Sequence, residues 1–133
     1  MTDWDWGRVV FDHVKLTVSD PEASKAFYRT VLGALEIPPL WEDGRGGQYA
    51  NLVVVKSDEP NTPIHIGFVA RTREEVDAFH AAGLAAGYRN NGAPGVREHY
   101  SSEAGGLYYA AFLLDPDGNN IEAVHRGEYP AAA

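Results

Sequence analysis

The sequence predicts an α+β fold made of two tandem modules, each ordered as one strand, one helix and three further strands. Three observations support this prediction. A strand followed by a capped helix occurs twice, and the two copies match without a gap at an offset of 52 residues (65 minus 13). The chain then closes on a strand, a tight turn and a second strand. Each module alone would bury little apolar surface, so we expect both to pack together as one domain, residues 1–133.

The first module is expected at about residues 8–57. Residues 9–18 alternate apolar and polar side chains, which is typical of a half-buried strand. The capping box Ser19-Asp20-Pro21-Glu22, with its early proline, predicts a helix that Gly33 ends. The remaining segments are predicted to be a short edge strand at 35–40, a flexible loop at 42–47 and a strand at 49–56.

The second module is expected at about residues 63–126. Its first strand, residues 63–70, contains His65. A second capping box, Thr72-Arg73-Glu74-Glu75, opens a helix that Gly87 closes. The segments after this helix are predicted to be a loop at 88–99 and a strand at 107–114.

The gapless match between the halves indicates an internal duplication. Its most specific pairs are Ala26-Phe27 with Ala78-Phe79, Leu32 with Leu84, and His13 with His65. The apolar neighbours of both histidines are expected to pack under the helices. We therefore expect the two histidines to point to the opposite face, where the two half-sheets could curl into a cleft.

The last strand carries a single acid, Glu122, after the turn Asp115-Pro116-Asp117-Gly118. An unpaired carboxylate on a half-buried strand costs several kcal/mol in desolvation. Three explanations are open: Glu122 points to the surface, it pairs with Arg126, or it binds a metal ion together with histidines from elsewhere in the chain.

Composition narrows the function classes. The chain has 133 residues, a formal net charge of −8 and no cysteine, which excludes disulfides, thiolate–metal sites and cysteine nucleophiles. The acidic balance argues against nucleic-acid binding and would allow a cationic ligand. No apolar run is long enough for a membrane span and no signal peptide is evident, so we expect a cytoplasmic protein.

The two histidines and Glu122 could together form a metal site. If Glu122 enters the same cleft, two imidazoles and one carboxylate suit Fe(II), Mn(II), Zn(II), Ni(II) or Co(II) and leave coordination positions open. The alternative is that both histidines are structural or lie on the surface.

Paired strand histidines at duplicated positions, followed by the motif DPDGNNIE, resemble the vicinal oxygen chelate superfamily. This superfamily includes glyoxalase I, type I extradiol dioxygenases, fosfomycin-resistance enzymes and bleomycin-resistance proteins. The resemblance implies the glyoxalase-like fold, a homodimer, and one divalent metal held by His13, His65 and Glu122. In several members the ligands come from two subunits, which would bring His13 to the partner's His65 and Glu122.

Departures from the family pattern narrow the expected activity. Glyoxalase I carries a fourth ligand, a glutamate, on the strand that corresponds to residues 51–55, where this chain has no acid. Extradiol dioxygenases carry a tyrosine where this chain has Phe112, and a histidine that is missing here. Bleomycin-binding members lack the metal ligands. We therefore expect a small oxygen-chelating substrate and slightly favour lyase or isomerase chemistry. The alternatives are an extradiol-type dioxygenase and a metal-free binding protein.

Three further residues are candidates for contact with the substrate. Tyr109 and His99 could act as the base, and Arg97 could clamp a carboxylate or phosphate. Each has a structural alternative, as a core or cleft-lining ring, a loop residue and a surface charge, respectively. Of the other two histidines, His80 is expected to face solvent and His125 is not expected to be a ligand.

Overall fold

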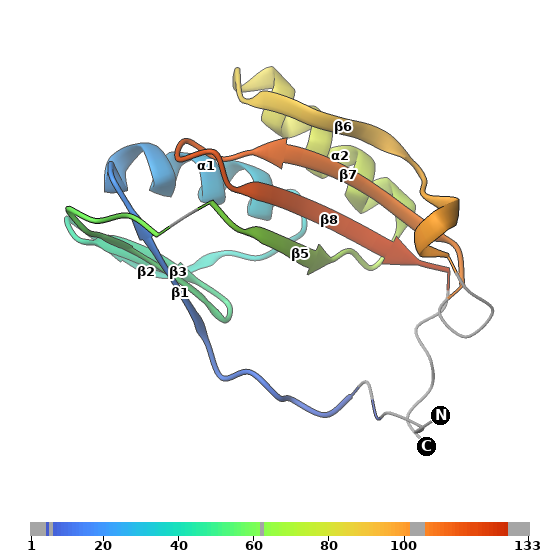
Figure 1. Ribbon diagram of the computed structural model, residues 1–133, viewed down its shortest axis with the longest axis horizontal. Helices are drawn as coiled ribbons and strands as arrows, with labels where there is room; N and C mark the ends of the chain where they lie inside the picture. The colour runs from blue at the N-terminus through green and yellow to red at the C-terminus, as the bar shows by residue number, and fades with distance from the viewer. Residues whose placement is uncertain (1–4, 6, 62, 102–105, 128–133) are drawn as a thin grey trace.

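The structure is a computed structural model that describes residues 5, 7–61, 63–101 and 106–127. It contains two four-stranded mixed sheets and two α-helices (Figure 1), which confirms the predicted α+β class and its two modules. Sheet A has the order β1-β4-β3-β2, with β1 at Val14–Val18, β4 at Leu52–Lys56, β3 at Gly46–Tyr49 and β2 at Pro39–Asp43. Sheet B has the order β5-β8-β7-β6, with β5 at His65–Val69, β8 at Asn120–Arg126, β7 at Tyr108–Leu114 and β6 at Arg89–Val96.

The two helices reproduce the duplication. Helix α1 covers Pro21–Gly33 and α2 covers Arg73–Ala85, so both ends of α2 lie 52 positions after those of α1 (73 minus 21, 85 minus 33). Thr72 caps α2 as predicted. The cap of α1 differs from the prediction: Asp20, rather than Ser19, accepts the amide hydrogens of the first turn, because Pro21 at the first helical position fixes Asp20 as the extended residue before it.

Several strand boundaries differ from the prediction, and the differences arise at turns and at an edge strand. Within the expected loop at 42–47, residues 44 and 45 form a tight hairpin turn and the others belong to β2 and β3. The expected strand at 49–56 is divided by a turn in which Ala50 has φ 51°. The expected loop at 88–99 contains β6, an edge strand whose register against β7 shifts twice. Its glycines and proline are typical of a loop, but an edge strand tolerates both.

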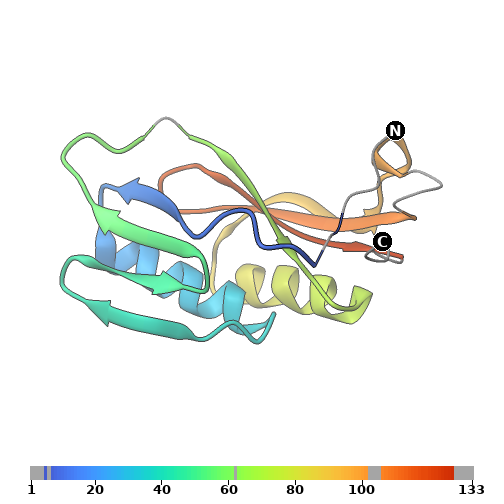
Figure 2. The same cartoon turned by 90° about the horizontal axis from the view of Figure 1, so that it is seen from below.

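Each helix covers one face of one sheet. Helix α1 packs on β3 and β4, α2 packs on β6, β7 and β8, and the helices also contact each other. Figure 2 shows α2 beneath sheet B, so that the opposite face of this sheet is not covered by a helix. We call this the open face. Neither described helix is long and apolar enough to cross a bilayer.

The turn between β7 and β8 joins the two modules. The Tyr28 hydroxyl on α1 donates to Asp115 Oδ2 at 2.6 Å, and both groups are buried. At the rim of the same junction, the exposed Ser19 hydroxyl donates to Asp117 Oδ1 at 2.5 Å. The Asp-Pro turn that marks the end of the sequence pattern therefore also fixes the second module against the first.

Candidate functional site

Glu122 lies on the open face of sheet B and is only 2% exposed. Its Oε1 accepts a hydrogen bond from His65 Nε2 at 2.6 Å, and its Oε2 accepts one from the Tyr108 hydroxyl. An imidazole and a phenol therefore satisfy the buried carboxylate. Arg126, which the sequence suggested as its partner, lies over the Tyr108 ring instead, with the guanidinium carbon 4.9 Å from the ring centroid.

The Asp-Pro turn sets the position of Glu122. Asp115 Oδ1 accepts from the backbone N–H groups of Asp117 and Asn119 at 3.0 and 2.8 Å. The Asn119 side chain in turn accepts from the Ile64 amide at 2.8 Å, which aligns the starts of β5 and β8. This parallel register pairs His65 with Asn120, and two residues later Gly67 with Glu122.

Gly67 leaves room beside the carboxylate. It stands opposite Glu122 in the register, and a Cβ atom built on it would lie 3.4 Å from Glu122 Oε1. Any longer side chain at this position would occupy the space next to the carboxylate. The glycine and the neighbouring His65 on the same strand thus define one side of the site.

Tyr108 holds its proton firmly. Burial is the main cause that raises the pKa of its hydroxyl above the usual value, and the hydrogen bond to Glu122 raises it further. Near neutral pH the phenol is therefore a hydrogen-bond donor to the carboxylate and not a base. Tyr108 is not one of the predicted site residues, because a run of seven mostly apolar residues does not show which side chains of β7 share a face with Glu122.

Tyr109, the neighbouring residue, lies on the opposite face of sheet B. Its hydroxyl donates to Asp77 Oδ1 on α2 at 2.6 Å, and this hydrogen bond is the main cause that raises the pKa of Tyr109. The structure therefore separates Tyr109 from Glu122. Successive strand residues point to opposite faces, so Tyr108, and not the predicted Tyr109, shares the face of Glu122.

The other two substrate-contact candidates lie near Tyr108. His99 is exposed on the short 3-10 helix η1 (Glu98–Tyr100) and stacks on Tyr100 with ring centroids 3.9 Å apart. Tyr100 in turn lies 5.2 Å from the Tyr108 ring. The Arg97 guanidinium lies 5.3 Å from the centroid of Phe112, the residue that pairs with Glu122 across β7 and β8.

Of the two remaining histidines, one differs from its prediction. His80 was expected to face solvent but is only 6% exposed, and its Nε2 contacts Asn90 Oδ1 at 2.9 Å. Helix α2 turns this residue towards β6, the strand that the sequence analysis did not predict. His125 contacts the Ala70 carbonyl oxygen, away from Glu122.

His13 is not part of the cluster around Glu122. It immediately precedes β1, its side chain is 55% exposed, and its Nδ1 contacts the exposed Asp12 carboxylate at 2.7 Å. The Asn51 side chain holds the Asp12 carbonyl oxygen at 2.7 Å and so fixes the backbone next to His13. Among the described residues of this chain, no three histidine, aspartate or glutamate side chains lie close enough together to hold a metal ion.

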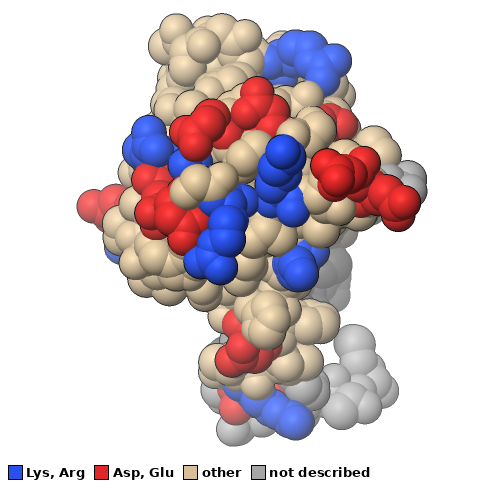
Figure 3. All heavy atoms as spheres, turned by 90° about the vertical axis from the view of Figure 1, so that its left-hand side faces the viewer, with Lys and Arg blue, Asp and Glu red and all other residues tan. Residues whose placement is uncertain are grey.

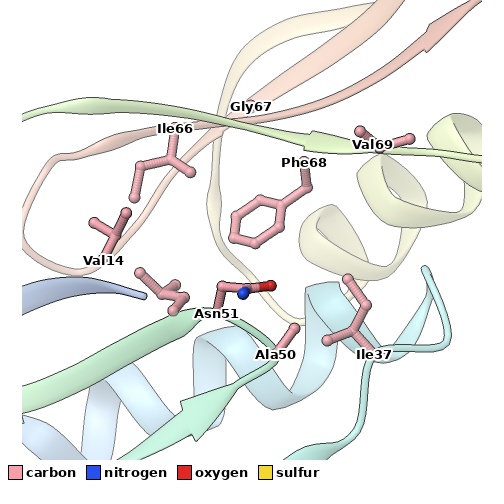
Figure 4. Close-up of a pocket in the computed structure, with 9 residues that line it drawn as sticks. Val14, Ile37, Ala50, Asn51, Ile66, Gly67, Phe68 and Val69 are labelled. Atoms are coloured by element: carbon pink, nitrogen blue, oxygen red, sulfur yellow. The ribbon is translucent and has the colours of Figure 1, made fainter. Parts of the chain in front are cut away.

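An apolar hollow of about 270 Å³ lies at the junction of the two sheets (Figure 4). Sheet A contributes Val14 and Leu52 to its wall, and β5 contributes Ile66, Phe68 and the backbone of Gly67. Its lining has few polar groups, so it offers no chemistry of its own. It lies on the side of β5 opposite the His65 side chain.

The Glu122 cluster fits two ligands of a divalent metal ion. An imidazole nitrogen and a carboxylate oxygen form a donor set that suits first-row transition metals. In the chain as described, a carboxylate that is 2% exposed meets the imidazole of His65, whose side chain is 52% exposed and open to a further partner. Glu122 could thus serve as a buried ligand and His65 as a solvent-accessible one, and among the described residues no third histidine or carboxylate joins them.

The sequence and the fold belong to a known class of protein. Residues 10–123 match the sequence profile of the Glyoxalase/Bleomycin resistance protein/Dioxygenase superfamily, and the chain belongs to this superfamily. A solved glyoxalase/bleomycin resistance protein from Albidiferax ferrireducens T118 is 38% identical, with a TM-score of 0.71, over 87% of this chain and 98% of that one.

More distant solved structures share the fold. A lactoylglutathione lyase from Agrobacterium tumefaciens is 19% identical, with a TM-score of 0.62, over 88% of this chain and 92% of that one. The oxidase ChaP-H2 is 18% identical, with a TM-score of 0.65, over 94% of this chain and 98% of that one. No curated protein sequence matches the chain.

Proposed function

We propose that this protein is a divalent-metal-dependent enzyme that acts on a small oxygen-chelating substrate at the open face of sheet B. One observation carries the proposal: Glu122, 2% exposed, is held against the accessible imidazole of His65. A buried carboxylate facing a histidine is costly for a fold to maintain, and such pairs concentrate at functional sites. A divalent metal bound there would supply Lewis-acid polarisation of the substrate oxygens.

We propose that His65 and Glu122 of one chain hold the metal together with His13 of a second copy. The exposure of His13 and its duplicated position support this arrangement, as does the lack of a third ligand near Glu122 among the described residues of one chain. The active form would then be a homodimer, and we expect it in the cytoplasm. The metal is Fe(II), Mn(II), Zn(II), Ni(II) or Co(II).

Among the reactions of the superfamily, we favour glyoxalase-like lyase or isomerase chemistry. Phe112 stands beside Glu122 where an extradiol dioxygenase carries a tyrosine, so the phenol of that reaction is missing from this position. Tyr108 supplies a phenol from the other side and, with its raised pKa, keeps Glu122 oriented. His99 remains our candidate base, because it is exposed and close to Tyr108 through Tyr100.

The test is elemental analysis of the purified protein and of apoprotein reloaded with each of the five metals. Wild type is expected to hold about one metal per chain, and both His65→Ala and Glu122→Gln are expected to lower metal affinity on the order of 100-fold or more. His125→Ala, on the other face of β8, is the matched control and should retain the metal. A wild type that takes up none of the five metals would contradict the proposal.

A metal-free small-molecule binding protein is the second candidate. The direct contact between His65 Nε2 and Glu122 Oε1, at 2.6 Å, favours it, since this pair already satisfies the carboxylate. This candidate predicts that ligand affinity is unchanged by a chelator. A complex that dissociates in the presence of a chelator would exclude it.

A further inference from the structure

The open face of sheet B is cationic, although the protein as a whole carries a net charge of −8. Glu122 is the single acidic residue within β5, β6, β7 and β8. The pairing registers place Arg89 and Arg126 on the same face as Glu122 and His65. Arg97, the residue after β6, lies opposite Tyr108 and is on this face as well. An acidic protein therefore presents basic side chains around the buried carboxylate of Glu122.

Two of these arginines, Arg97 and Arg126, differ from Arg29 and Arg45 in sheet A and its helix. Figure 3 shows basic and acidic side chains interspersed over the end of the molecule that holds α1 and the β2–β3 hairpin, where Arg29 pairs with Glu42 and Arg45 with Asp43. Arg97 and Arg126 form no ion pair with any residue that the structure describes. Their charge is available to a ligand.

The position of Arg97 is fixed before any ligand binds. Its backbone N–H donates to the Tyr108 carbonyl oxygen at 2.7 Å, and its Nη2 donates to the Ala93 carbonyl oxygen at 2.7 Å. The guanidinium lies on the Phe112 ring and close to two glycines of β6. A Cβ atom at Gly95 would lie 3.1 Å from its Nη1, and one at Gly92 would lie 3.3 Å from its Nη2. The glycines thus make room for a flat, pre-oriented guanidinium.

Aromatic rings surround the same surface. Phe112 lies 6.0 Å from the His65 ring on one side of the carboxylate, and Tyr108 lies 5.2 Å from Tyr100 on the other. Arg126 stacks on Tyr108 in the way that Arg97 stacks on Phe112. Planar rings beside cations favour a ligand that is itself flat and negatively charged.

We propose that the substrate is a planar aromatic carboxylate. Its ring packs against Phe112 and Tyr108, its carboxylate pairs with Arg97, and Arg126 adds attraction from the far side of Tyr108. The Arg97 fork matches a carboxylate in a bidentate way that a lysine cannot reproduce. This inference rests on the proposed function in one respect, namely that the open face of sheet B is where the substrate binds.

The test uses calorimetric titration with 2-hydroxybenzoate and benzoate, each compared with its neutral amide. The titrations are carried out on chelator-treated protein and on metal-loaded protein. Wild type is expected to bind at least one carboxylate roughly tenfold more tightly than the matching amide in both forms, with an affinity that falls as salt rises.

Three variants locate the preference. Arg97→Met, which keeps an apolar chain on Phe112, should remove the roughly tenfold preference, Arg97→Lys should retain part of it, and Arg126→Met should lower it by about threefold. Arg73→Met is the matched control, because Arg73 stacks on Tyr109 at 4.7 Å on the helix side of the same sheet. It removes one positive charge and should leave the preference unchanged.

The two proposals fail in different ways. If no carboxylate of the panel is preferred over its amide, or if Arg73→Met and Arg97→Met have equal effects, the aromatic-carboxylate inference is wrong, whether or not metal binds. If the preference depends on Arg97 but no metal is taken up, the inference stands and metal-dependent catalysis is wrong.

Discussion

His13 and His65 occupy equivalent positions in the two modules, yet their surroundings differ completely. His65 meets a carboxylate that is 2% exposed, whereas His13, as far as the described residues go, meets Asp12 alone, whose side chain is 97% exposed. The strand pairs explain the difference. Where module two pairs Gly67 with Glu122, module one pairs Lys15 with Val53. Both modules therefore share the fold, while Gly67 and Glu122 distinguish module two and form part of its candidate site.

The comparison also shows how the modules depend on each other. Module one has no buried acid on its last strand, but its helix contributes Tyr28, which donates to Asp115 in the turn of module two. The same Asp-Pro turn also positions Glu122. Variants that separate the shared scaffold from the site of module two can test this division, and four are described below in order of expected effect on stability.

Asp115→Ala is expected to have the largest effect, a loss of about 3 kcal/mol in the free energy of unfolding. The carboxylate is 1% exposed and accepts hydrogen bonds from Tyr28, Asp117 and Asn119, all of which would lose a partner. Urea denaturation measures the change. Asp117→Ala, at an exposed contact of the same turn, should cost less than about 1 kcal/mol. Equal losses in the two variants would contradict the role of Asp115 as the junction.

Tyr28→Phe should cost about 2 kcal/mol, because it removes a buried hydrogen bond to a carboxylate. It should also change the response to alkali. Burial, with Asp115 as the next cause, raises the pKa of Tyr28 well above the usual 10.0. Above about pH 10 the unfolded chain releases the phenol proton of Tyr28, whereas the folded chain keeps it. The free energy of unfolding therefore falls by up to about 1.4 kcal/mol per pH unit.

In Tyr28→Phe this contribution is absent, so stability should decline less steeply above pH 10 than in wild type. Denaturation curves at several pH values from neutral to strongly alkaline measure the two slopes. Identical slopes in wild type and variant would show that the phenol does not retain its proton in the folded chain.

His65→Ala should destabilise the protein by about 1 kcal/mol, because it leaves the buried Glu122 with Tyr108 as its one described hydrogen-bond partner. The expected loss is small because the imidazole is 52% exposed. His13→Ala is the equivalent change in module one and should alter stability by less than about 0.5 kcal/mol. Thermal denaturation of metal-free protein compares them directly, and a larger loss for His13→Ala would reverse our assignment.

Gly67→Ala should have the smallest effect, within about 0.5 kcal/mol of wild type. The new Cβ would lie 3.4 Å from Glu122 Oε1, an ordinary contact, and the lower entropy of the unfolded chain would offset it. Urea denaturation measures this change as well. A loss of several kcal/mol would mean that the space beside the carboxylate is tighter than the structure shows.

Much of the fold could be predicted because its signals are local. Capping boxes located the helices, the shared histidine and Ala-Phe pairs revealed the duplication, and the Asp-Pro turn located the last hairpin. The predicted boundaries are wrong at β6, because glycine and proline occur both in loops and in irregular edge strands. Composition alone does not distinguish the two.

The candidate site was only partly predictable, because it depends on strand register. The sequence pointed to Glu122 and His65, but the choice between Tyr108 and Tyr109 follows from pairing with β8, a contact between residues distant in sequence. The same applies to Arg126, which is near Glu122 along the chain but stacks on Tyr108. No local pattern records which side chains meet across strands.

The most direct test of the account is the metal content of a mixed dimer. His13→Ala and Glu122→Gln are co-expressed with different affinity tags, and the heterodimer is purified through both. If each site takes His13 from one chain and His65 with Glu122 from the other, one of its two sites is intact, and the heterodimer should hold about one metal while each variant alone holds none. A heterodimer without metal, beside a wild type that holds two per dimer, would contradict a site shared between subunits.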